Sequence, residues 1–326
     1  MYQGAAVEAA HNFYEAMTHS QTTELVSIVM RTVGNRPREI RRAIASIANN
    51  TWRPLEVIVV YQGPDNSNWL DLQKLPCEFP SLTLNVLINN AVGDRRAQNL
   101  NIGWNRALGR YIGFLDDDDT LAPNHIALLI DSMQATGKAW SYAQVNLRRE
   151  NEALEIVSES QPFPGRIFSL KSLWTENFLP IHSFLIDRKA LHSSLQQAPF
   201  HEELDRSEDW DFLLHLAFYH EPAIVDEFTA TYHVSNGDRN TNLSLMDISG
   251  KEETHEQPNL EAWNRCKCIV EGRKAELAKK IWWSSEYLDI PPHTDALQSG
   301  TLPISQSRSL RDRVIRKLIR ILERAL

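Results

Sequence analysis

The sequence predicts an α/β fold built on a mainly parallel sheet, and two observations support this prediction. Apolar runs with strand character alternate with segments of helical periodicity between residues 25 and 147. These strands read as continuous apolar runs, which is typical of parallel sheets covered by helices on both faces. Such sheets bind ligands at the carboxyl ends of their strands, so we expect the functional site in the loops that follow the strands.

The parallel part of the sheet is predicted from four apolar runs. Their boundaries are Leu25–Met30, Leu55–Tyr61, Leu82–Asn89 and Tyr111–Leu115. Three helices are expected between and after them, at Arg38–Ala48, at Ala97–Leu108 and at Pro123–Thr136. The last of these has proline at an early position and Gly137 near its end, which are common start and stop signals.

The second half of the chain carries fewer regular patterns. A further strand is predicted at Trp140–Leu147, and the polar residues 148–164 are expected to form a loop or an edge hairpin. An amphipathic helix begins near Trp210, which puts Glu208 and Asp209 at its N-terminus. Residues 259–280 are also predicted to be helical.

These patterns divide the chain into four parts. Residues 1–24 are expected to be a helical N-terminal extension, and residues 25–245 form the main α/β domain. A helical appendage with a linker rich in proline and serine follows at 246–308, and a basic amphipathic helix occupies 309–326.

Composition excludes several classes of protein. The chain of 326 residues has 42 acidic and 34 basic side chains, and its net charge of −8 argues against nucleic acid as a partner. Its three cysteines form no C-x-x-C pair, so neither a disulfide framework nor a thiolate zinc site is indicated. Because no apolar run could span a bilayer and no signal peptide is recognisable, we expect a cytoplasmic protein.

The C-terminal residues 311–326 form the exception to this acidic character. Six basic side chains against two acidic ones give this segment a net charge of +4, and its apolar residues recur at helical spacing. Such a helix suits an anionic membrane surface, which predicts a peripheral position at the inner face of the plasma membrane. Packing on its own domain or on a dimer partner is the alternative.

The run Asp116–Asp119 directly follows the fourth apolar strand. If the extended geometry persists, Asp116 and Asp118 point to one side and Asp117 and Asp119 to the other. Carboxylates that converge at the end of a strand favour a hard cation such as Mg²⁺ or Mn²⁺, held between protein and substrate diphosphate oxygens. An acidic turn that caps the following helix is the alternative.

Four segments in sequence order resemble the family 2 glycosyltransferases, a resemblance that covers Leu25 to Leu243. They are VSIVMRTVGNRP, EVIVVYQGPD, GDRRAQNLNIGWNRALGRYIGFLDDDDTLAP and SEDWDFLLHLA. The resemblance implies the GT-A fold, a Rossmann-like α/β domain, for residues 25–245. It also implies a nucleotide-diphosphate sugar as donor and a divalent cation, Mn²⁺ or Mg²⁺, as cofactor.

By this resemblance, the nucleotide-binding residues are Arg31, Thr32, Asn35, Arg36, Gln62, Arg95, Arg96, Asp116 and Asp117. Two departures from the family pattern stand among them. Tyr61 and Gln62 replace an aspartate that often pairs with a uridine base, and Gln98 replaces an arginine for which Arg95 and Arg96 are expected to compensate.

The resemblance also implies the roles of the remaining site residues. Asp116 and Asp118 hold the metal, with His233 as a late metal contact, and His182 and Trp210 lie on the acceptor side. Asp209, next to Glu208, is the general base that takes the proton of an acceptor hydroxyl during in-line attack, so the enzyme is expected to invert the anomeric centre.

The predicted function is therefore sugar transfer to a glycan or a lipid-linked saccharide of a bacterial envelope polysaccharide. Two alternatives remain open at this point. The segment LDDDDTL also fits a haloacid-dehalogenase-type phosphatase motif, with Asp116 as nucleophile, Asp118 as acid and base, and Thr120 following. The other alternative is a relative that binds carbohydrate without catalysis.

Overall fold

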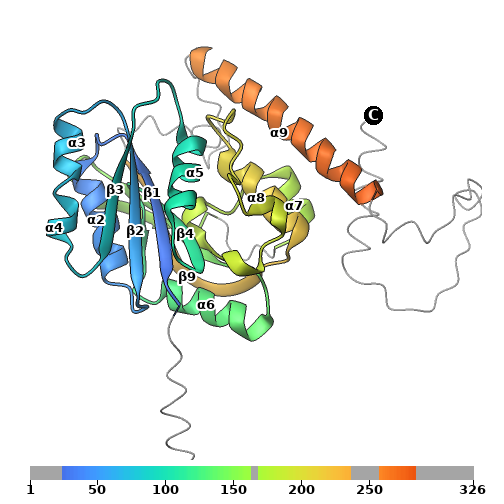
Figure 1. The fold of residues 1–326 in the computed structure, drawn as a ribbon, viewed down its shortest axis with the longest axis horizontal. Coiled ribbons are helices and arrows are strands. Elements are labelled where there is room, and N and C mark those ends of the chain that lie inside the picture. Colours follow the sequence, from blue (N-terminus) through green and yellow to red (C-terminus); the bar gives the residue numbers. More distant parts are fainter. Residues whose placement is uncertain (1–23, 163–167, 236–256, 284–326) are drawn as a thin grey trace, which may run out of the picture.

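The structure is a computed structural model that describes residues 24–162, 168–235 and 257–283 (Figure 1). Residues 1–23 of the predicted N-terminal extension and the predicted basic helix at 309–326 lie outside the described residues. The described part contains one curled sheet with helices packed on it (Figure 1). Its element order confirms the predicted α/β class.

The sheet has nine strands in the spatial order β3-β2-β1-β4-β8-β6-β9-β5, with β7 paired to β6. The first four strands are β1 (Val26–Thr32), β2 (Leu55–Gln62), β3 (Thr83–Asn89) and β4 (Tyr111–Asp116). They pair in parallel, as predicted, with β1 between β2 and β4. The carboxyl ends of these strands therefore meet at one edge.

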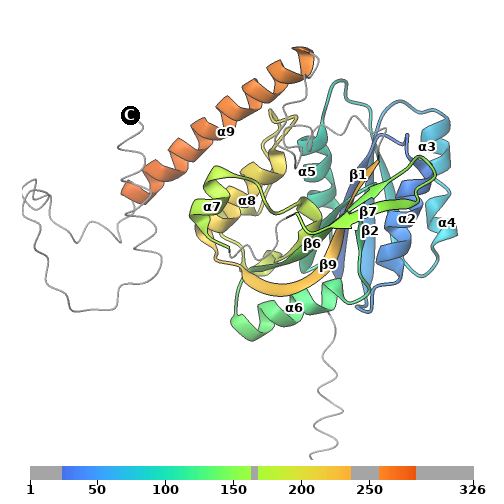
Figure 2. The same cartoon turned by 180° about the vertical axis from the view of Figure 1, so that it is seen from behind.

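The other half of the sheet is mixed. Its strands are β5 (Thr120–Leu121), β6 (Trp140–Glu150), β7 (Ile156–Ser160), β8 (Phe184–Asp187) and β9 (Ala223–Ser235). Strand β8 runs antiparallel between β4 and β6, whereas β9 pairs with β6 in parallel. Strands β6 and β7 form the edge hairpin expected for residues 148–164 (Figure 2).

The helices predicted from periodicity are present with small shifts at their ends. They are α2 (Pro37–Ala48), α5 (Arg96–Arg106), α6 (His125–Thr136), α8 (Glu208–Tyr219) and α9 (Gln257–Trp283). Gly137 ends α6 with a φ of +66°, a left-handed conformation that glycine adopts readily. Three short helices were not predicted, because they are too brief to show a period: α3 (Ser67–Leu72), α4 (Leu75–Glu78) and α7 (Leu170–Thr175). Single 3₁₀ turns occupy Ile181–Ser183, Arg188–Ala190 and Ser193–Leu195.

Alternate side chains of β1 enter two separate hydrophobic layers. Ile28 and Met30 pack with Ile40 and Ile44 of α2, on the face that α6 also covers. Val29 packs on the opposite face with side chains of α5, α8 and α9. A strand buried on both faces has no polar side to alternate with, which explains the continuous apolar run in the sequence.

Gly103 of α5 lies where a side chain does not fit. A Cβ atom at this position would lie 2.2 Å from Cγ1 of Val29. We expect Gly103→Ala to destabilise the protein by about 1–3 kcal/mol through overpacking, although alanine favours helix formation by roughly 1 kcal/mol. Urea unfolding measures the difference in free energy, and Val29→Ala should restore part of it.

Gly272 of α9 provides the matched control for this substitution. A Cβ atom at Gly272 would meet no heavy atom within 4 Å, so Gly272→Ala should leave stability unchanged or raise it. If Gly103→Ala unfolds at the same urea concentration as the original protein, the close approach of α5 to β1 is not a packing constraint.

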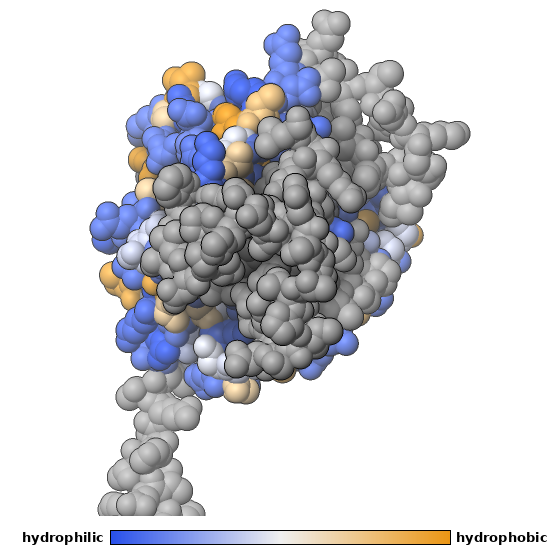
Figure 3. Space-filling model, turned by 90° about the vertical axis from the view of Figure 1, so that its right-hand side faces the viewer, coloured by the Kyte–Doolittle hydropathy of each residue, from blue (hydrophilic) through white to orange (hydrophobic). Residues whose placement is uncertain are grey.

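The described surface is mainly hydrophilic on the face seen in Figure 3, with hydrophobic residues in small separate groups. Among the described helices, none combines the length and the apolar character needed to cross a bilayer.

Candidate functional site

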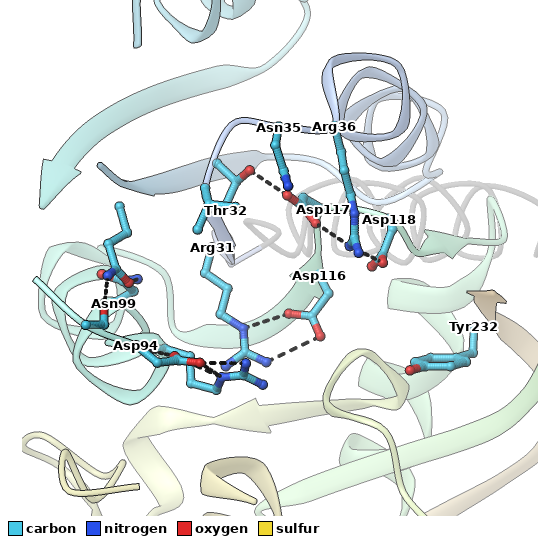
Figure 4. A pocket seen from close by; sticks show the side chains of 14 residues that line it. Arg31, Thr32, Asn35, Arg36, Asp94, Asn99, Asp116, Asp117, Asp118 and Tyr232 are labelled. Carbon is cyan, nitrogen blue, oxygen red and sulfur yellow. Dashed lines mark hydrogen bonds and ion pairs between the residues drawn. The ribbon is translucent and has the colours of Figure 1, made fainter. Parts of the chain in front are cut away.

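A cavity of about 420 Å³ opens at the carboxyl ends of the parallel strands (Figure 4). Its lining residues come from β1, β2, β4, β9 and α5, and from the loops that follow β1, β3 and β4. They are Arg31, Thr32, Val33, Asn35, Arg36, Gln62, Gly93, Asp94, Arg96, Asn99, Asp116, Asp117, Asp118 and Tyr232. The cavity therefore lies at the edge of the sheet where the sequence predicts a site, and it brings together all the predicted nucleotide-binding residues except Arg95.

The aspartate run does not continue the strand. Strand β4 ends at Asp116, and the N–H of Asp119 donates to the carbonyl of Asp116 across a turn (3.3 Å). Asp116, Asp117 and Asp118 consequently all line the cavity, while Asp119 is fully buried. The predicted alternation of faces is wrong, because it assumed extended geometry beyond Asp116.

Each of the three aspartates of the run that line the cavity has a partner from β1 or the loop after it (Figure 4). Nε of Arg31 lies 2.9 Å from Oδ1 of Asp116, and the hydroxyl of Thr32 donates to Asp117 (2.5 Å). Arg36 forms an ion pair with Asp118. Because β1 and β4 are neighbours in parallel register, the basic residues after one strand reach the acidic residues after the other.

Negative charge at the end of the run is only partly neutralised. Burial raises the pKa of Asp117 to about 6, against the bond from Thr32 and the charge of Arg36. Burial and the charges of Asp119 and Asp117 hold the pKa of Asp118 well above its usual range. Burial would raise the pKa of Asp116 as well, but the charge and hydrogen bonds of Arg31 lower it. Crowded carboxylates of this kind favour a cation.

The donor set fits a divalent cation that shares its ligands with a substrate. Among the described residues, no group of three or more His, Cys, Asp or Glu side chains is arranged to hold a metal by itself. Asp116 and Asp118 both face the cavity, however, and Mg²⁺ is commonly bound by one or two carboxylates together with phosphate oxygens.

Arg31 connects the cavity to helix α8. Its guanidinium binds Asp116 through Nε and contacts Glu208 through Nη1. Glu208 is the first residue of α8 and only 2% of its side chain is exposed, so this pair is shielded from solvent. Sequence reasoning assigned Arg31 to the nucleotide alone; the structure adds this bridge between the aspartate run and Glu208, the neighbour of the predicted base.

Asp209 lies in the first turn of α8, outside the cavity lining. Its Oδ1 accepts a hydrogen bond from the N–H of Trp210 (2.7 Å), and its Oδ2 accepts one from Nδ2 of Asn177 (3.1 Å). Burial and the neighbouring charge of Glu208 raise the pKa of Asp209 to about 6, although Arg31 opposes the shift. A carboxyl group in this range takes up and releases protons near neutral pH.

The predicted residues after β2 and β3 differ in accessibility. Gln62 lines the cavity, but its amide oxygen accepts from the N–H of Arg95 (3.2 Å) and from Asn99 (3.1 Å), and its NH₂ donates to the loop after β3. Arg96 also lines the cavity and pairs with Asp94 (2.8 Å). The side chain of Arg95 is exposed and donates to the carbonyl of Val92 (2.9 Å), so it takes no part in the lining.

His233 does not face the cavity in this arrangement. Nδ1 of its ring lies 2.6 Å from Oε1 of Glu150, and Nε2 lies 2.8 Å from Oγ1 of Thr120. Both ring nitrogens are thus engaged within the protein and neither is available to a metal. Its predicted metal role gains no support from the structure.

His182 is buried behind the cavity wall. Its Nδ1 lies 2.9 Å from Oδ2 of Asp119, and its ring stacks on Tyr232, with ring centroids 5.9 Å apart. Burial lowers the pKa of His182, but the charges of Asp119, Asp116 and Asp209 outweigh it and raise the value. Because only 1% of the histidine is exposed, contact with an acceptor would require Tyr232 or its surroundings to move.

Trp210 is packed between helices. Its indole N–H donates to the carbonyl of Leu173 in α7 (2.7 Å), and Nζ of Lys274 in α9 lies 4.2 Å from the ring centroid. These contacts hold Trp210 between α7 and α9, and its predicted acceptor role gains no support from the structure.

Sequence reasoning missed several residues that line the site. Asp94, Asn99 and Tyr232 all face the cavity, and Val33 and Gly93 complete its wall. Val33, Gly93, Asp94 and Asn99 belong to the segments that carry the resemblance, so their position was an available signal, whereas Tyr232 lies outside these segments.

Comparisons with known proteins bear on the family and the fold of this chain. Residues 27–195 match the family described as Glycosyl transferase family 2. An uncharacterized glycosyltransferase of Methanocaldococcus jannaschii is 25% identical over 66% of this chain and 72% of its own length. WcaA of Escherichia coli, named for colanic acid biosynthesis as a glycosyl transferase, is 26% identical over 69% of this chain and 78% of its own. The solved structure of S. aureus TarS 1–349 in complex with UDP-GlcNAc has a TM-score of 0.51 at 14% identity, with 81% of this chain and 74% of that chain covered. This likeness of folds agrees with the predicted GT-A architecture.

Proposed function

Because this chain belongs to glycosyl transferase family 2 and is a glycosyltransferase, we propose that it moves a sugar from a nucleotide-diphosphate sugar to an acceptor hydroxyl with inversion. One observation carries the mechanistic part of the proposal. Arg31 binds both Asp116 in the cavity and Glu208 at the start of α8. It therefore links the proposed donor site to the first turn of α8, which carries Asp209.

Asp209 acts as the general base in this proposal. Its carboxylate takes the proton of the acceptor hydroxyl while the hydroxyl oxygen forms a bond to the anomeric carbon. The bond from that carbon to the diphosphate oxygen breaks on the opposite face, which inverts the configuration. A sugar hydroxyl is a poor nucleophile at neutral pH, and a positioned carboxylate remedies this. The pKa of about 6 leaves Asp209 mainly deprotonated at pH 7.

Asp116 and Asp118 would hold a divalent cation, Mn²⁺ or Mg²⁺, on the donor side of the cavity. When bound, the cation offsets the charge that builds on the departing diphosphate. Arg36 and Arg96 line the same cavity, paired with Asp118 and Asp94, and their further N–H groups would bind phosphate oxygens of the donor. Thr32 and Asn35 complete the donor side.

The acceptor proposed here is a glycan or a lipid-linked saccharide of an envelope polysaccharide. Support comes from the relative WcaA, which is named for colanic acid biosynthesis. Cytoplasmic location and membrane contact through residues 309–326 stay predictions, since that segment lies outside the described residues.

The phosphatase alternative loses its support. Asp116 would have to serve as nucleophile, yet it ends the fourth strand of the sheet and is bound by Arg31. The hydroxyl of Thr120 is engaged by His233. No described feature favours this reading over sugar transfer.

Thermal-shift measurements with UDP-, GDP-, dTDP- and CMP-linked sugars, each with and without Mn²⁺, test the proposal. Ligands that bind the native state raise the melting temperature by mass action. We expect one nucleotide class to raise it only when the cation is present, and Asp118→Ala to remove the effect. Phosphatase activity that is lost in Asp116→Asn, without any nucleotide binding, would overturn the proposal.

The pH dependence of transfer follows from the pKa of Asp209. The base acts when deprotonated, so kcat should rise through about pH 6 and level off above pH 7. Asp117 has a pKa of about 6 as well, but it lies on the donor side. Donor affinity measured by calorimetry across the same pH range separates the two groups, because only Asp117 should affect it. A kcat that is constant from pH 5 to 8 would contradict the assignment.

A further inference from the structure

We propose that Asn177 is a positioning residue that orients the carboxylate of Asp209 for proton transfer. This inference rests on the proposed function, because it assumes that Asp209 is the base. Asn177 lies in the segment between α7 and the 3₁₀ turn Ile181–Ser183, some 30 residues before α8, and no sequence pattern singles it out.

The amide of Asn177 has a defined orientation. Its Oδ1 accepts a hydrogen bond from the N–H of Leu179 (3.4 Å), and its Nδ2 donates to Oδ2 of Asp209 (3.1 Å). A backbone N–H can only donate, so the oxygen of the amide must face Leu179 and the NH₂ must face the carboxylate. The bond to Asp209 therefore does not depend on an arbitrary choice between nitrogen and oxygen.

The segment that carries Asn177 is firmly anchored. Phe178 and Leu179 follow it directly and are 2% and 3% exposed, within the core layer that α8 also enters. The bond from the indole of Trp210 to Leu173 fixes α7 against α8 on the other side. Asn177 therefore lies in a segment that is packed against α8, which holds it in place relative to Asp209.

Two fixed donors then determine the plane of the Asp209 carboxylate. The N–H of Trp210 binds Oδ1 and the amide of Asn177 binds Oδ2, which prevents rotation about the Cβ–Cγ bond. Catalytic groups lose rate steeply when their orientation is not held. The amide also stabilises the anionic form, against the burial and the charge of Glu208 that favour the protonated form.

Asn177→Asp is the sharpest test, because it keeps the shape and the acceptor for Leu179 while it replaces only the donor. We expect kcat to fall about tenfold or more at pH 7, and the pH midpoint of kcat to move upward by about one unit because two carboxyl groups then share one proton. The dissociation constant of the donor and the KM for the donor should stay unchanged. Asn177→Gln, which retains an amide donor, should recover part of the rate.

Asn151→Asp is the matched control. Asn151 makes the same kind of bonds, accepting from the N–H groups of Ala153 and Glu155, but in the exposed turn between β6 and β7. It should leave kcat and its pH profile unaltered. Asn177→Ala introduces no charge next to Asp209, so it separates the two roles. If it lowers the melting temperature but leaves kcat and its pH midpoint unchanged, Asn177 is purely structural and the inference is overturned.

Failure of the inference and failure of the proposed function are distinguishable. If Asp209→Asn loses activity while Asn177→Asp behaves like the original enzyme, Asp209 is the base and Asn177 does not position it. If Asp209→Asn retains activity, the proposed base itself is wrong and the inference about Asn177 fails with it.

Discussion

Asp209→Asn should abolish most of the transferase activity while the enzyme still binds its donor. The substitution keeps the size of the side chain and removes its ability to take a proton, so we expect kcat to fall by roughly 10²–10⁴-fold. The carboxylates of the cavity are untouched, because Asp209 lies outside its lining. Single-turnover transfer and calorimetric donor binding, measured on the same preparation, separate the two effects.

Asp131→Asn provides the control for the chemical change. Asp131 lies on α6 with its side chain exposed, so its loss of charge should affect neither transfer nor stability. The melting temperature of Asp209→Asn should stay within a few degrees of the original, and it is expected to rise slightly because a carboxyl with a raised pKa favours its uncharged form. Full activity of Asp209→Asn would mean that another group removes the proton.

Arg31→Met should cause the largest loss of stability of any single change in the site. The guanidinium is the partner of both Asp116 and Glu208, and its side chain is 15% exposed while that of Glu208 is 2% exposed. Removing one partner of a buried ion pair leaves an uncompensated charge and typically costs about 3–5 kcal/mol. Urea or thermal unfolding of the purified variant measures this cost directly.

The double variant Arg31→Met with Glu208→Gln tests the cause of that loss. If the unpaired buried charge dominates, removing it should recover more than half of the stability that Arg31→Met alone loses. Lys74→Met, in which the lost cation is 64% exposed, should have little effect and serves as the control. The prediction fails if the double variant is less stable than Arg31→Met.

The pH dependence of this stability loss has a defined sign. Arg31 lowers the pKa of Asp116 in the folded state, so this pair stabilises the protein above the ordinary value of 3.8 and loses the effect as pH falls through the lowered value. Without Arg31, burial raises the pKa of Asp116, so the difference between the original protein and Arg31→Met should be largest near pH 8 and shrink as the pH falls toward about 4.

The parallel half of the fold was predictable because its signal is local. Each of the first four strands is rich in apolar residues, and β1, β2 and β4 are buried along almost their whole length, as expected for parallel strands covered on both faces. The second half was less predictable. Strand β8 is four residues long and is inserted antiparallel between β4 and β6, a pairing that depends on contacts distant in sequence.

The candidate site shows the same division between local and distant information. The aspartates and the loop after β1 were predicted to share a site because both follow strands, and they do. Partners that arrive from elsewhere in the chain were not predictable. Glu150 contacts Nδ1 of His233 only because β6 pairs with β9. Asn177 reaches Asp209 only because α7 packs on α8.

Helix α9 was expected to be an appendage, yet its buried stripe belongs to the main core. Cys266, Val270 and Leu277 pack in the same hydrophobic layer as α8, and Nε of Arg273 lies 2.7 Å from the buried carboxylate of Asp211, two residues after the proposed base. A fragment that keeps this packing against α8 must consequently extend at least through Leu277, well past residue 195, where the family match ends. A truncation at residue 195 would remove α8 and α9 together, and with them Glu208, the partner that Arg31 has outside the cavity.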